Sequence, residues 1–152
     1  YYDAKIPQGI DEADRAIIQI VSDNLVKALQ YYSHEKGASL RDVITKPIIP
    51  GFSWVASGVG DFSLGKSLIE VKCSGKNFSS ADYRQVLMYW LLSYLHAIER
   101  DGLEWSACVL VNPRLNRLLE ISFDELIRLT SPLGSKVELI ESFRAAIDIE
   151  TI

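Results

Sequence analysis

The sequence predicts an α/β domain in which a mixed central sheet is flanked by helices, and three observations support this fold class. The chain has 152 residues, of which 48% are hydrophobic, so it can bury one sizeable core. Some segments place apolar residues with the period of a helix, and others show the short apolar runs of strands. These segments follow in the order helix, β-hairpin, helix, strand, strand, helix, which describes a layered domain. We therefore expect one domain over residues 1–152.

The first expected element is a helix over residues 11–32. Asp11 suits its N-cap, where a carboxylate accepts a hydrogen bond from a backbone N–H of the first turn. Lys36 and Gly37 end it. Its apolar residues form a stripe with helical spacing, which needs a partner surface to cover it. The stripe consists of Ala13, Ile17, Ile20, Val21, Leu25, Ala28 and Leu29.

A turn-rich connector and a β-hairpin come next. The prolines of residues 46–51 exclude a central strand, and residues 52–62 and 67–73 have the composition of strands. A turn on Gly65 and Lys66 joins these two strands, because glycine at the first central position suits a type II′ turn. The turn therefore fixes the register in which the strands pair.

The second half of the chain predicts one long helix, two strands and two short helices. Ser79 or Ser80 caps the long helix, which runs to about residue 99, and Gly102 is its C′ residue. Most of the circumference of this helix is apolar, so it should be extensively covered. The later elements are strands over residues 105–111 and 118–122 and helices over residues 123–129 and 137–147.

The composition excludes some classes of protein. The chain has 16 Lys and Arg against 20 Asp and Glu, and a net charge of −4 excludes a nucleic-acid binder that relies on bulk electrostatics. No apolar run approaches the roughly 20 residues that span a bilayer, so we expect no membrane partner. Cys73 and Cys108 lie in apolar stretches that predict buried strands, which favours reduced thiols and a cytoplasmic location. Because the chain does not begin with Met, we expect a piece of a longer polypeptide.

The residues that point to chemistry lie on the hairpin. The register set by the turn pairs Phe62 with Ile69 and places Asp61 opposite Glu70, with Cβ atoms about 4.5 to 5.5 Å apart. Two carboxylates this close destabilise the sheet unless a cation lies between them. Lys72 lies on the same face as Glu70, because side chains alternate along a strand. The sequence thus places two carboxylates and one ammonium group on one face.

This trio suits phosphodiester hydrolysis. Two carboxylates, waters and a backbone carbonyl are ligands that Mg²⁺ prefers. The metal ion can lower the pKa of a bound water and polarise the phosphoryl oxygen. A neighbouring lysine can orient the attacking water and offset charge on the phosphorus.

The same residues resemble the signature of the PD-(D/E)XK nuclease superfamily, which has the restriction-endonuclease-like fold. That signature is an Asp at the end of one strand and (D/E)-x-K on the next, here Asp61 followed by Glu70 and Lys72. Gly60 stands where the name of the motif has Pro. The resemblance covers residues 52–122 and implies a core of order α-β-β-β-α-β with a mixed central sheet flanked by helices.

A second motif is similar to that of the RecB and lambda exonuclease branch of the superfamily. Gln85 and Tyr89 form its Q-x-x-x-Y pattern, and a spacing of four places both on one helical face. The resemblance implies that they support the lysine side of the site or the scissile strand. It also implies an acidic residue on the first helix, for which Asp14 and Asp23 are both candidates.

The resemblance implies a metal-dependent deoxyribonuclease that leaves 5′-phosphate ends. Asp61, Glu70 and the backbone carbonyl of Val71 would hold Mg²⁺ or Mn²⁺. Lys72 would position the attacking water. DNA is the expected partner, and such domains are often attached to helicases or ATPases in DNA repair, restriction or anti-phage defence.

Positive charge is concentrated around the expected site. The bases in question are Lys66, Lys72, Lys76, Arg84, Arg114 and Arg117. Lys76 and Arg84 flank the loop of residues 74–80, which we expect to contact the nucleic-acid backbone. The alternative for this loop is an ordinary solvated polar segment.

Other interpretations of the motifs remain open. Glu70 and Lys72 could form an exposed ion pair, and Tyr89 could be a core residue with Gln85 at its edge. A nuclease fold could also serve as an inactive module that binds nucleic acid or a partner protein. An RNA-specific or structure-specific nuclease would carry the same residues.

Overall fold

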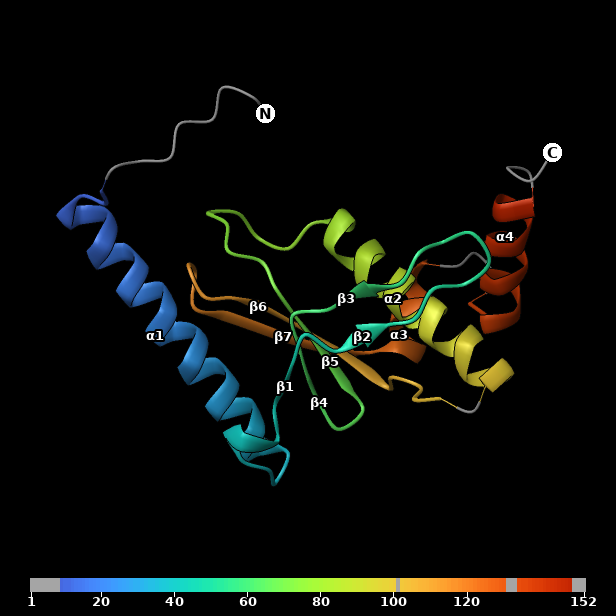
Figure 1. Cartoon of the computed structure of the whole chain (residues 1–152), viewed down its shortest axis with the longest axis horizontal. Coiled ribbons are helices and arrows are strands. Elements are labelled where there is room, and N and C mark those ends of the chain that lie inside the picture. The colour runs from blue at the N-terminus through green and yellow to red at the C-terminus, as the bar shows by residue number, and fades with distance from the viewer. Residues whose placement is uncertain (1–8, 101, 131–133, 149–152) are drawn as a thin grey trace.

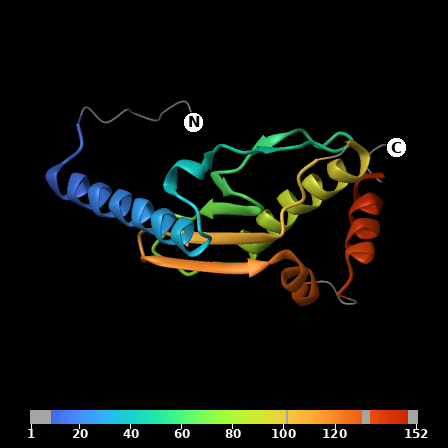
Figure 2. The ribbon, with the colours of Figure 1, turned by 90° about the horizontal axis from the view of Figure 1, so that it is seen from below.

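A computed structural model describes residues 9–100, 102–130 and 134–148. The fold is α/β, with helices on both faces of a mixed five-stranded sheet (Figures 1 and 2). Strand order in this sheet is β1-β4-β5-β6-β7, in which β5 and β6 are parallel and the other neighbours are antiparallel. The strands are β1 (Ile44–Thr45), β4 (Phe62–Leu64), β5 (Ser67–Val71), β6 (Ala107–Asn112) and β7 (Arg117–Ser122).

The hairpin of β4 and β5 has the register that the turn predicts. Phe62 pairs with Ile69, and Leu64 pairs with Ser67. Gly65 has φ +55°, whereas Lys66 keeps a negative φ, which is the pattern of a type II′ turn. The turn residues alone therefore determine which side chains of β5 lie on each face of the sheet.

Helix α1 (Glu12–Glu35) covers one face of the sheet with its C-terminal half. The Asp11 carboxylate accepts a hydrogen bond from the Asp14 N–H at 2.7 Å, as expected for the N-cap. Leu29 and Tyr32 are buried against Ile69 and Val109 of the sheet. The N-terminal half of α1 runs past the sheet (Figures 1 and 2), and the early residues of the predicted stripe, Ala13, Ile17 and Ile20, are exposed. The 3-10 helix η1 (Leu40–Asp42) follows α1.

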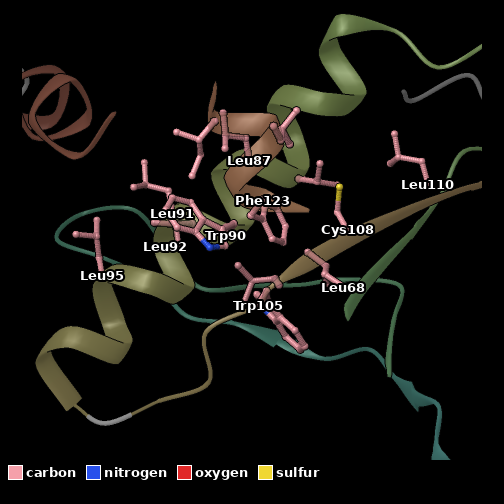
Figure 3. Close-up of a cluster of buried hydrophobic side chains, with 14 residues drawn as sticks. Leu68, Leu87, Trp90, Leu91, Leu92, Leu95, Trp105, Cys108, Leu110 and Phe123 are labelled. Carbon is pink, nitrogen blue, oxygen red and sulfur yellow. The ribbon is translucent and has the colours of Figure 1, made fainter. Parts of the chain in front are cut away.

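Helix α2 (Ser80–Arg100) covers the other face, together with α3 (Phe123–Thr130) and α4 (Lys136–Asp148). Ser79, rather than Ser80, directly precedes α2, and its backbone N–H and its Oγ both donate to the Asp82 carboxylate, as in the returning half of a capping box. Figure 3 shows the core on this face, where Trp90 and Phe123 pack with ring centroids 5.9 Å apart. This core holds α2 rigidly against β5 and β6.

Three expectations about local structure are wrong. Residues 52–62 do not form one strand, because β2 (Ile48–Ile49) and β3 (Gly58–Val59) form a separate two-stranded sheet, and β4 begins only at Phe62. Cys73 is exposed and lies beyond the end of β5, whereas burial of Cys108 in β6 raises the pKa of its thiol to about 12. Gly102 does not have the positive φ of a C′ glycine and instead lies close against Ala97. Both cysteines are free thiols.

Gly60 separates β3 from β4 at a crowded point. Its N–H donates to the Pro47 carbonyl at 2.9 Å, and a Cβ atom here would lie 3.1 Å from the Leu68 side chain. A proline would lose that hydrogen bond and crowd Leu68, which accounts for glycine at this position of the motif.

Within the described part of the chain, no helix has both the length and the apolar character required to span a membrane.

Candidate active site

The candidate site lies at the C-terminal end of β5, on the face that α2 covers. Glu70 projects from β5 into this layer and is only 5% exposed. Lys72 follows directly after the strand, and its backbone N–H bonds to the Val111 carbonyl of β6 at 2.8 Å. The parallel pairing of β5 and β6 thus anchors the backbone on which both side chains stand.

Four predicted site residues form one hydrogen-bonded network. Lys72 Nζ lies 3.0 Å from Glu70 Oε1 and donates to Gln85 Oε1 at 2.6 Å. Gln85 Nε2 donates to the same Glu70 oxygen at 2.8 Å and to the Tyr89 hydroxyl at 2.9 Å. The expected shared face of Glu70 and Lys72, and of Gln85 and Tyr89, is therefore confirmed. The network holds the lysine ammonium over one oxygen of a buried carboxylate.

Asp61 directly precedes β4 and is joined to this network through the backbone of β5. The ladder of the hairpin ends at Phe62, so Asp61 lies just beyond it. Its Oδ2 accepts a hydrogen bond from the Val71 N–H at 2.8 Å, and its backbone carbonyl accepts from the Lys46 N–H. The carboxylate is thus fixed beside Val71, next to Glu70, with its second oxygen available for a ligand.

The environment of Glu70 disfavours its charged form. Burial is the largest effect and raises the pKa of the Glu70 carboxyl, and the negative charge of Asp61 raises this pKa further, although Lys72 and, to the smallest extent, the backbone N–H of Asp61 partly oppose both. Glu70 Oε2 is buried and has no hydrogen-bond partner among the described residues. An unpartnered buried carboxylate oxygen is costly, so its position calls for a cation.

The donor set fits Mg²⁺ or Mn²⁺. Oxygens of Glu70 and Asp61 and the carbonyl of Val71 are hard ligands, and Mg²⁺ is commonly held by one or two carboxylates together with waters. The residues with described placement contain no group of three or more His, Cys, Asp or Glu side chains suited to a metal ion. A metal ion here would therefore rely on two carboxylates, a backbone carbonyl and waters.

The other residues that the sequence predicts for the site lie outside the hydrogen-bonded network of Glu70, Lys72, Gln85 and Tyr89. Lys76 is exposed on the loop after β5, and Arg84 is exposed on α2, where it lies 3.4 Å from Ser80 Oγ. Lys66 is in the hairpin turn, at the end of β5 opposite Lys72, so its charge does not belong to the site. On α1, Asp14 is exposed and Asp23 bonds to Gln19 at 2.8 Å, and no hydrogen bond of the described residues joins either carboxylate to the network.

Sequence reasoning missed Asn112, the last residue of β6. Its Nδ2 donates to the carbonyls of Ser74 and Lys76, at 2.9 and 3.0 Å, and its Oδ1 accepts from the N–H groups of Arg114 and Leu115. Asn112 is 1% exposed and so ties the loop after β5 to the β6–β7 turn. An Asn before Pro at the end of an apolar run signals a turn, but its bonds to a distant loop have no local signal.

Replacement of Asp61 separates its charge from its hydrogen bond. Asp61→Asn should leave the metal-free melting temperature equal or higher, because its amide oxygen can still accept from Val71 while the repulsion with Glu70 is removed. Asp61→Ala should lower stability by about 1–3 kcal/mol, since the Val71 N–H loses its acceptor. Thermal unfolding in EDTA measures both. A large loss in the Asn variant would show that the charge itself is structural.

Comparison of the chain with protein-family models, with curated proteins and with solved structures gave no match.

Proposed function

We propose that this chain is a metal-dependent nuclease that hydrolyses phosphodiester bonds of DNA. The observation that carries the proposal is the buried Glu70 carboxylate, which has one oxygen bonded to Lys72 and the other without a partner. A second carboxylate, Asp61, is held beside it by the Val71 N–H. A solvated surface ion pair would not be buried or bonded in this way.

The arrangement of elements supports a restriction-endonuclease-like core. Within the five-stranded sheet, α1 is followed by the antiparallel strands β1, β4 and β5, then by α2 and by β6 parallel to β5, while β2 and β3, which come between β1 and β4 in the chain, form a separate sheet. With β2 and β3 set aside, this order is compatible with the α-β-β-β-α-β core that the motif resemblance implies. Asp61 directly precedes β4, Glu70 lies on the neighbouring strand β5, and α2 supplies Gln85 and Tyr89.

Each side chain has a distinct role in the proposed reaction. Asp61, Glu70 and the Val71 carbonyl would hold Mg²⁺ or Mn²⁺, which would supply an activated water and a polarised scissile phosphate. The Lys72 ammonium orients the attacking water and offsets negative charge that develops on the phosphate. Gln85 contacts both Lys72 and Glu70, so it fixes the ammonium relative to the carboxylate.

Gln85 and Tyr89 are positioning residues in this proposal. The amide of Gln85 can accept from Lys72 and donate to Glu70 at once, because its oxygen and nitrogen point to different partners. Tyr89 accepts the second Gln85 N–H and so fixes the orientation of this amide.

The direct test is a cleavage assay on linear, circular and single-stranded DNA and on RNA, with Mg²⁺, with Mn²⁺ and with EDTA. We expect cleavage that requires the metal ion and yields 5′-phosphate ends. A parallel measurement of the melting temperature against Mg²⁺ concentration separates an inactive module from an enzyme with an untested substrate. Absence of both cleavage and metal-dependent stabilisation would overturn the proposal.

A further inference from the structure

A cavity of about 360 Å³ lies between α1 and the β6–β7 turn, on the sheet face opposite α2. Figures 1 and 2 both show this turn beside the middle of α1, and Asn24 of α1 donates to the Pro113 carbonyl at 3.0 Å. Asn112, with its four hydrogen bonds, forms part of the cavity wall. The cavity is therefore preformed by fixed backbone.

The cavity is basic although the chain is acidic. Its wall includes Lys27 and Arg117, and none of the described residues that line it carries a carboxylate. Amide groups of Asn24 and Asn116 add hydrogen-bonding groups to this wall. An anion is the ligand that such a wall selects, and bases with amides are the usual partners of phosphate oxygens.

An aromatic ring stands at the same cavity. Tyr31 lines it and is 61% exposed, so its ring is not used by the core. An exposed ring beside cations is the combination on which proteins stack an unpaired nucleic-acid base. The volume suits a unit the size of one nucleotide, and stacking on Tyr31 requires a base that is not paired.

The cavity is connected to the candidate site through β6. Val111 lines the cavity and pairs with Val71, and its carbonyl accepts from the Lys72 N–H. Arg117 also donates a hydrogen bond to Asn77 on the loop after β5. The same end of the sheet thus presents the metal ligands on one face and a basic cavity with an aromatic ring on the other.

We infer that this cavity binds one nucleotide of a nucleic-acid strand, with its phosphate on Lys27 and Arg117 and its base on Tyr31. From this cavity, the nucleic-acid strand crosses the end of the β-sheet over the loop after β5 and reaches Lys72. This inference rests on the proposed nuclease function and adds to it a single-stranded segment of the substrate and the residues that hold that segment.

Binding of labelled oligonucleotides in EDTA tests the inference without cleavage. Fluorescence anisotropy should be measured for single-stranded dT and rU oligomers of equal length over a salt series. Lys27→Ala and Arg117→Ala should each raise Kd about three- to tenfold and reduce the slope of log Kd against log salt by about 0.7. Tyr31→Ala should raise Kd about tenfold, whereas Tyr31→Phe, which keeps the ring, should bind as wild type does.

Arg144→Ala is the matched control, because Arg144 is exposed on α4, against the opposite face, and its loss changes the net charge equally. Equal weakening by this control, or an unchanged salt slope in the cavity variants, would overturn the inference. A duplex that binds as tightly as the single strand would also contradict it. Weaker binding of either oligomer by the Lys27, Arg117 and Tyr31→Ala variants supports the inference. The oligomer with the lower Kd for wild type shows whether the cavity prefers deoxyribose or ribose.

Steady-state kinetics can test binding in the cavity separately from the proposed nuclease activity. In a cleavage assay, the cavity variants should raise KM about three- to tenfold and leave kcat within about twofold, since they remove binding that is equal in ground and transition states. If all three variants kept the wild-type KM and metal-dependent cleavage, the binding role of the cavity would be contradicted and the nuclease proposal would stand. Residue-dependent binding with neither cleavage nor metal-dependent stabilisation would contradict the nuclease proposal and leave binding in the cavity.

Discussion

Glu70→Gln is expected to reduce metal-dependent cleavage by about a thousandfold or more and, at the same time, to make the metal-free protein more stable at pH 8. The loss follows because a neutral amide is a poor metal ligand, and a bound metal ion is worth several kcal/mol of transition-state stabilisation. The gain follows because Glu70 is buried beside Asp61, with one oxygen unpartnered. Cleavage assays and denaturant unfolding in EDTA measure the two effects.

The stability difference should depend on pH with a definite sign. Burial raises the pKa of Glu70 in the folded protein, so the folded state binds this proton more tightly than the unfolded state. The contribution of Glu70 to stability is therefore full below the unfolded pKa, about 4.3, and is lost as pH rises through the folded pKa. Wild type and Glu70→Gln should differ least near pH 4 and most near pH 8.

Glu99→Gln is the matched control, since Glu99 is exposed on α2. It should leave both the cleavage rate and the metal-free stability at pH 8 unchanged. Mg²⁺ should raise the melting temperature of wild type and of this control, and not that of Glu70→Gln. Greater stability of wild type than of Glu70→Gln at pH 8 in EDTA would mean that the ion pair with Lys72 outweighs the cost of burial.

The parts of the fold that local chemistry determines could be predicted from the sequence. Gly65 in the turn fixes the register of β4 and β5, and with it the faces on which Glu70 and Lys72 lie. The cap at Asp11 and the spacing of Gln85 and Tyr89 are local patterns of the same kind. Each of these depends on neighbours within a few residues, where propensity and periodicity are informative.

The parts that depend on distant partners could not be predicted. Asn112 bonds to the carbonyls of Ser74 and Lys76, 38 and 36 residues earlier in the chain, and to the N–H groups of Arg114 and Leu115, 2 and 3 residues later. Only the bonds to Arg114 and Leu115 have a signal in the sequence. The depth of Glu70 depends on how α2 packs over β5, which periodicity does not specify. The apolar stripe of α1 predicted full coverage, but the sheet ends near Asn24, so Ile17 and Ile20 stay exposed.

Charge counting along the chain was misleading for Lys66 but not for Arg117. Lys66 is close to Glu70 in sequence but lies at the other end of β5. Arg117 is far from Glu70 in sequence, yet the parallel pairing of β5 and β6 and the turn after β6 bring it to the same end of the sheet. Pairing of strands, rather than proximity in sequence, decides which bases lie at the same end of the sheet as the candidate site.

Lys72→Ala is expected to reduce kcat by about a hundred- to a thousandfold while metal binding survives. The ammonium contacts Glu70 Oε1, whereas Oε2 and Asp61 remain available as metal ligands. A group that stabilises developing charge typically contributes this much to the rate. Metal affinity, measured by calorimetry or by the Mg²⁺-dependent melting temperature, should fall far less than kcat.

Lys72→Arg and Gln85→Ala show how this effect arises. Arginine keeps the positive charge, but its planar group cannot donate to Glu70 and Gln85 as the compact ammonium does, so little activity should return. Gln85→Ala leaves the ammonium in place without its second acceptor and should cost less than Lys72→Ala. Parallel loss of kcat and metal affinity in Lys72→Ala would instead make Lys72 a support for the Glu70 carboxylate, because removal of its charge leaves that buried carboxylate harder to ionise.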